Sequence, residues 1–148
     1  MQNVRKYLPT VARLLFGLIF FVFGLNGFLG FLPMPEHPGG AGAFLGALAA
    51  TGYMFPLIKG TETLVGALLL TNRFVPLALV LLAPVMVNIV AFHGVLEPTS
   101  LGMPVALLAM HLYLAWTYRR SYTAVLAARA LPAGASADTT VAGETVAS

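Results

Sequence analysis

Four long stretches of this chain contain almost only apolar residues, and they limit its fold more than any other feature. They cover approximately residues 11–32, 53–71, 74–92 and 101–118. Each approaches the ~20 residues that an α-helix needs to cross a hydrocarbon core of about 30 Å. Within a bilayer, a helix satisfies its own backbone hydrogen bonds without closing on other segments. The four stretches therefore predict an all-α integral membrane bundle of four transmembrane helices.

The composition favours a lipid environment as well. The chain is 59% hydrophobic and 9% charged, whereas about 25% of residues are charged in soluble domains. Its length allows one domain, which we place at residues 1–131. Residues 132–148 are rich in Ala, Gly, Thr and Ser and predict a disordered cytoplasmic tail. The apolar segment 42–51 is too short to span, so it predicts a short helix or a re-entrant piece.

The basic residues predict the orientation of the bundle. Seven of them lie before the first helix, between the second and third, or after the fourth: Arg5, Lys6, Arg13, Arg73, Arg119, Arg120 and Arg129. The opposite loops carry Glu36, His37 and Glu97 and neither Lys nor Arg. The positive-inside rule then places both termini in the cytoplasm. Because the basic residues lie at helix ends, the net charge of +3 does not indicate a nucleic-acid partner.

Several kinds of bound group are excluded by the residues present. Without cysteine, the chain forms no disulfide, thiol relay or cysteine-held iron–sulfur cluster. A haem held by His93 and His111 would need both at one level, whereas their helix positions differ in depth by roughly 10 Å. One buried glutamate and one buried histidine are too few for a metal site. We therefore expect no metal and no covalently attached cofactor.

Lys59 and Glu62 are the only ionisable residues within residues 56–70. Ionisable groups are costly inside a bilayer, so they usually face the interior of a bundle and mark a functional site. At 100° per residue, Lys59, Glu62 and Thr63 share about a third of the helix circumference. Glycines on this face and on the first helix would let the two helices pack closely: Gly66, Gly17, Gly24 and Gly27.

Each of the four predicted helices carries a polar residue at a similar depth. Asn26 and Glu62 lie about 9 Å from the outer ends of their helices, Asn88 about 6 Å and His111 about 12 Å. His93 points away from Asn88 and is left out. The candidate ligand or proton site is therefore Glu62, Lys59, Asn26, Asn88 and His111. No catalytic residue is assigned.

The same residues have a structural interpretation, which stays open. Asn26 and Asn88 are typical of interhelical hydrogen bonds, each worth about 1 kcal/mol. Lys59 and Glu62 alternatively neutralise one another, with the lysine head reaching outward. His111 is typical of a core histidine whose hydrogen bonds are satisfied.

Three segments of the chain resemble a known family. They are Arg13-x-x-x-Gly17 with the Phe-rich stretch 20–28, then Lys59-Gly-Thr-Glu62-x-x-x-Gly66-x-Leu-Leu-Leu-Thr-Asn-Arg73, then Leu82-Ala-Pro-Val-Met-Val-Asn88. Over roughly residues 10–128, the chain resembles the DoxX-like family of small four-helix bacterial membrane proteins.

The resemblance implies a multi-pass protein of the bacterial inner membrane. The family is named for a subunit of a thiosulfate:quinone oxidoreductase, so the resemblance implies a quinone as ligand and an oxidoreductase as partner protein. We therefore expect a membrane subunit of a quinone-linked oxidoreductase, with its polar site around Lys59 and Glu62. The alternative is a non-enzymatic scaffold, assembly partner or permeation element in which these two residues form a structural ion pair. Whether the chain is itself an enzyme, and whether it associates with copies of itself, stays open.

Overall fold

The described part of the chain folds into helices alone. The structure, a computed structural model, describes residues 2–33, 36–123 and 126. In order, its elements are α1 (Gln2–Leu29), α2 (Gly39–Ala50), α3 (Met54–Leu70), α4 (Val75–Leu96), η1 (Pro98–Ser100), α5 (Gly102–Thr117) and η2 (Arg119–Tyr122). No strand occurs among the described residues, so the all-α prediction is confirmed for them. The predicted tail, 132–148, lies outside the described residues.

Helices α3 and α5 match their predicted positions to within one residue, α4 continues to Leu96, four residues past its predicted end, and the first helix differs at both ends. Helix α1 begins at Gln2 rather than near residue 11, and it ends at Leu29 rather than near residue 32. The predicted start is wrong because a run of apolar residues marks only the part of a helix suited to lipid. The helix itself continues into the more polar residues that precede the run.

Small residues bring α1 and α3 together along their length. A Cβ atom added to Gly24 would lie 2.6 Å from the backbone nitrogen of Thr63, and one added to Gly66 would meet the backbone of Phe21. Such separations are shorter than any real contact of a Cβ atom. The predicted packing of these two helices through glycine is therefore confirmed, and it is the small-residue packing common between membrane helices.

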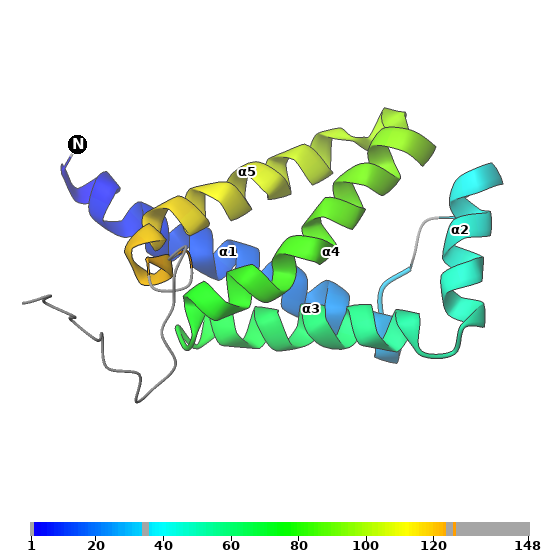
Figure 1. The fold of residues 1–148 in the computed structure, drawn as a ribbon, viewed down its shortest axis with the longest axis horizontal. Coiled ribbons are helices and arrows are strands. Elements are labelled where there is room, and N and C mark those ends of the chain that lie inside the picture. Colours follow the sequence, from blue (N-terminus) through cyan, green and yellow to red (C-terminus); the bar gives the residue numbers. More distant parts are fainter. Residues whose placement is uncertain (1, 34–35, 124–125, 127–148) are drawn as a thin grey trace, which may run out of the picture.

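An apolar core joins the long helices at the end of the molecule where α3 turns into α4. Its fully buried side chains come from α1, α3, α4 and α5: Phe16, Val65, Leu69, Ala78, Leu82 and Leu114. The turn between α3 and α4 is tight, with positive φ angles at Asn72 (56°) and Phe74 (50°). From this turn α3 and α4 diverge, and α2 stands at their far end (Figure 1).

Helix α2 is the short apolar helix predicted near residues 42–51. It is followed after a brief turn by α3, and the two helix axes differ in direction by 92°. Its glycine- and alanine-rich sequence has no charged residue. Because α2 turns sharply away from α3, it lies across the space that opens between α3 and α4 (Figure 1).

Two of the described helices are long and apolar enough to cross a membrane alone, α1 over Lys6–Leu29 and α4 over Val75–Leu96. Helices α2 and α3 meet the same criterion only when taken together as a bent pair. Helix α5 is apolar but has 16 residues. The described residues therefore contain two or three candidate spans, and the chain has the character of a membrane protein.

Arg13 occupies a place that the charge pattern did not predict. It lies inside α1, its side chain is buried, and its guanidinium donates a hydrogen bond to the backbone oxygen of Leu69. Arg13 is therefore not a loop residue before the first helix. The last carbonyl groups of a helix lack intrahelical donors and carry the negative end of its dipole. The guanidinium of Arg13 supplies a donor to one of these carbonyl groups and places a positive charge at the negative end of the α3 dipole.

Candidate functional site

A cavity of about 320 Å³ lies where the helices diverge. All five α-helices and the segment between α1 and α2 contribute to its wall. Most of the wall is apolar and much of it aromatic, including Phe20, Phe23, Phe44, Phe55 and Phe92. A volume near 300 Å³ with a mostly apolar wall and a few polar groups is typical of small-molecule sites.

Lys59 and Glu62 form an ion pair on this wall. The Nζ atom of Lys59 lies 2.8 Å from Oε2 of Glu62, and the two side chains are 14% and 6% exposed. The lysine ammonium also lies 5.7 Å from the ring centroid of Phe55. Because the residues are three apart on α3, the pair follows from helix geometry alone. The predicted contact between them is confirmed.

The glycines of α1 position this pair. A Cβ atom at Gly27 would overlap the aliphatic stem of Lys59, and one at Gly24 would lie 3.0 Å from Cβ of Glu62. The bare backbone of α1 therefore confines both side chains from one side. The lysine head bends toward Glu62 while its stem lies on Gly27, so it does not simply reach outward.

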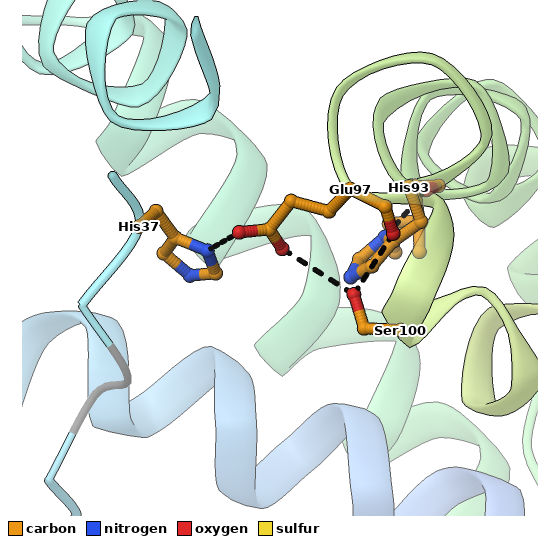
Figure 2. A network of polar contacts seen from close by, with 5 residues as sticks. His37, His93, Glu97 and Ser100 are labelled. Atoms are coloured by element: carbon orange, nitrogen blue, oxygen red, sulfur yellow. Dashed lines mark hydrogen bonds and ion pairs between the residues drawn. The ribbon is translucent and has the colours of Figure 1, made fainter. Parts of the chain in front are cut away.

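One residue of the cavity wall, His37, joins distant parts of the chain. His37, just before α2, places Nδ1 2.6 Å from Oε1 of Glu97, at the end of α4. Ser100 donates from Oγ to the other carboxylate oxygen of Glu97 at 3.4 Å (Figure 2). His37 also packs edge-on against Phe92, with ring centroids 5.9 Å apart. These contacts hold the start of α2 against the end of α4.

The predicted site residues do not all come together. Lys59, Glu62 and Asn88 line the cavity, whereas Asn26 and His111 do not belong to its wall. Asn26 exchanges two hydrogen bonds with the backbone of Leu32, at 2.6 Å and 3.2 Å, and so closes the turn after α1. Asn88 is exposed and also lines a second cavity of about 210 Å³ between α3 and α4.

His111 lies on α5 one helical turn beyond Leu107, which lines the cavity. The histidine is buried and packs edge-on against Phe16, with ring centroids 5.8 Å apart. Its Nδ1 has no hydrogen-bond partner within the described part of the chain. The expectation of a core histidine is confirmed, and the expectation that its hydrogen bonds are satisfied is wrong for this atom.

Two further histidines belong to the cavity, and sequence reasoning left both out of the site. His93 was set aside because it points away from Asn88 on an ideal helix, yet both line the cavity. Its Nδ1 bonds the backbone oxygen of Ile89 at 2.8 Å, which turns the ring back along α4. His37 was assigned only to an outer loop. The signal that pointed to it was the presence of His37 and Glu97 in the two loops on the same side.

The described residues bring together no group of three His, Cys, Asp or Glu side chains that could hold a metal ion. The polar groups on the cavity wall can instead hydrogen-bond an organic molecule. Comparison of the chain with protein-family models, with curated proteins and with solved structures finds no match.

Proposed function

We propose that this chain is a DoxX-like protein of the bacterial inner membrane whose cavity binds a quinone-like amphipathic molecule. In this proposal it acts as the membrane subunit of a quinone-linked oxidoreductase. The observation that carries the proposal is the Lys59–Glu62 pair on the wall of a largely apolar cavity. The apolar wall suits the ring and tail of such a molecule, and the pair supplies polar contacts for its oxygen atoms. Since the chain has no cysteine, an iron–sulfur centre would belong to a partner protein.

The proposal includes four membrane spans with both termini in the cytoplasm. Helices α3 and α5 have 17 and 16 residues, or about 25 Å each at 1.5 Å per residue. Local thinning of the bilayer accommodates helices slightly shorter than its core. The basic residues that follow α3 and α5 support the placing of these ends on the cytoplasmic side.

Reporter fusions test this topology. Green fluorescent protein fused after Ser148 is expected to fluoresce, and alkaline phosphatase at the same position is expected to be inactive. Phosphatase inserted after Thr99, in the connection between α4 and α5, is expected to be active because that connection faces outward. Phosphatase activity after Ser148 would contradict the proposed orientation, and inactivity after Thr99 would contradict the proposed spans.

Ligand retention tests the site. The protein is purified in mild detergent from native membranes, and the small molecules that it retains are identified by mass spectrometry. We expect the wild type to retain a quinone. We expect Glu62→Gln to retain at least tenfold less of it, because the amide lacks the charge that orders Lys59. Thr61→Val is the matched control, since Thr61 lies on the same helix, is not part of the cavity wall and bonds only its own helix at Leu57.

The alternative function is a scaffold or assembly partner in which Lys59 and Glu62 have a structural role. Its supporting observation is the confinement of the pair against Gly24 and Gly27. Equal retention of quinone by the wild type and Glu62→Gln, or bulk lipid alone in both, would favour this alternative.

A further inference from the structure

The two histidines of the cavity each have one ring nitrogen in a hydrogen bond and one with no partner among the described residues. In His37, Nδ1 faces Oε1 of Glu97 at 2.6 Å. In His93, Nδ1 faces the backbone oxygen of Ile89 at 2.8 Å. Both partners are acceptors at ordinary pH, so in each contact the Nδ1 atom carries the proton and donates it. In a neutral ring the other nitrogen, Nε2, then has a lone pair and no hydrogen.

Each neutral ring therefore has one nitrogen that can accept a hydrogen bond, on the part of the cavity wall formed by α4 and the segment before α2. Neither Nε2 atom takes part in a hydrogen bond with the described residues, and both residues belong to the cavity wall. On the part of the wall formed by α3, Lys59 offers N–H donors beside the carboxylate of Glu62. The two parts of the wall therefore differ in chemistry: Lys59 can donate to a carbonyl oxygen, whereas a neutral histidine that donates through Nδ1 can only accept at Nε2.

We propose that the cavity selects a molecule with a hydroxyl donor, of the phenol or hydroquinone class, whose O–H group donates to Nε2 of His37 or of His93. This inference rests on the proposed function and names the redox form that the site prefers. A quinone carbonyl beside either histidine would face a lone pair and form no hydrogen bond there. A hydroquinone places an O–H group at the same position and donates a hydrogen bond to the histidine.

The test compares matched ligands on the full-length protein in lipid nanodiscs at pH 8, where an imidazole ring is ordinarily neutral. Anaerobic calorimetric titration is performed with decylubiquinol, decylubiquinone and the dimethyl ether of the same hydroquinone, which has the ring and tail but no O–H group. We expect decylubiquinol to bind at least tenfold more tightly than the other two, which corresponds to about 1.4 kcal/mol. The wild type alone decides this comparison, so it does not depend on any variant.

Variants then assign the preference to the histidines. At least one of the two variants His37→Leu and His93→Leu is expected to reduce the preference for decylubiquinol to about threefold or less. Ser100→Ala is the matched control, because Ser100 bonds Glu97 in the same network and does not line the cavity. It is expected to retain the wild-type preference.

The possible results separate the two proposals. Equal affinities for the three ligands, or tighter binding of decylubiquinone, would overturn this inference and leave the proposed function standing. A preference that survives in both histidine variants would overturn the assignment to His37 and His93. Absence of binding by all three ligands to folded wild type would overturn both the inference and the proposed function.

Discussion

Replacement of Lys59 by methionine is expected to destabilise the folded protein by about 3 kcal/mol, because it leaves the carboxylate of Glu62 buried without its partner. The side chain of Glu62 is 6% exposed, so water does not replace the lost ammonium. Glu62→Gln is expected to have a smaller effect, since the amide oxygen can still accept a hydrogen bond from Lys59. The measurement is reversible unfolding in mild detergent with increasing dodecyl sulfate.

The double variant shows whether the two residues act as a pair. Lys59→Met with Glu62→Gln removes both charges and is expected to recover most of the stability lost in Lys59→Met. Removing a whole buried ion pair is often close to neutral, whereas removing one member is not. Additive losses in the double variant would show that the two side chains are not coupled, in conflict with their separation of 2.8 Å.

Two glycines of α3 are expected to respond to the same substitution with opposite signs. Gly66→Ala is expected to destabilise the protein by about 2–3 kcal/mol, because the new Cβ atom meets the backbone of Phe21 and must push α1 away. Gly60→Ala is expected to stabilise it by about 0.5–1 kcal/mol, because no atom lies within 4 Å of the new Cβ and alanine favours the helix.

The comparison isolates helix packing from helix propensity, since both glycines lie in one helix and receive one methyl group. The same unfolding assay measures both variants. A Gly66→Ala protein as stable as Gly60→Ala would show that α1 and α3 do not approach as closely as the structure places them. Losses in both variants would show that α3 does not tolerate alanine for a reason other than contact with α1.

Residues close in the chain were predicted best. Lys59 and Glu62 are three apart on one helix, so their contact follows from helix geometry once the helix is recognised. The glycine face of α3 and its counterpart on α1 were also visible, because a regular spacing of small residues indicates where helices meet. The start of α1 was not visible in the sequence, because the helix begins several residues before the apolar run does.

Depth along separate helices was a weaker guide. Asn26, Asn88 and His111 were grouped because they lie at similar levels, yet only Asn88 reaches the cavity. Depth is one coordinate of three, and the rotation of each helix decides whether a side chain faces a cavity, a turn or the core. The bond from Asn26 to the backbone of Leu32 depends on how the chain leaves α1, which residue spacing does not specify.

The sequence by itself determined the helical class, the apolar surface suited to lipid and the ion pair on α3. Each of these depends on residue type and on spacing within one helix, where backbone geometry is regular. Only the tertiary structure decided that His37 meets Glu97, 60 residues away, and that His93 joins His37 on the cavity wall. Such contacts arise from how α3 and α4 diverge and how α2 turns across their ends, which depends on packing between helices.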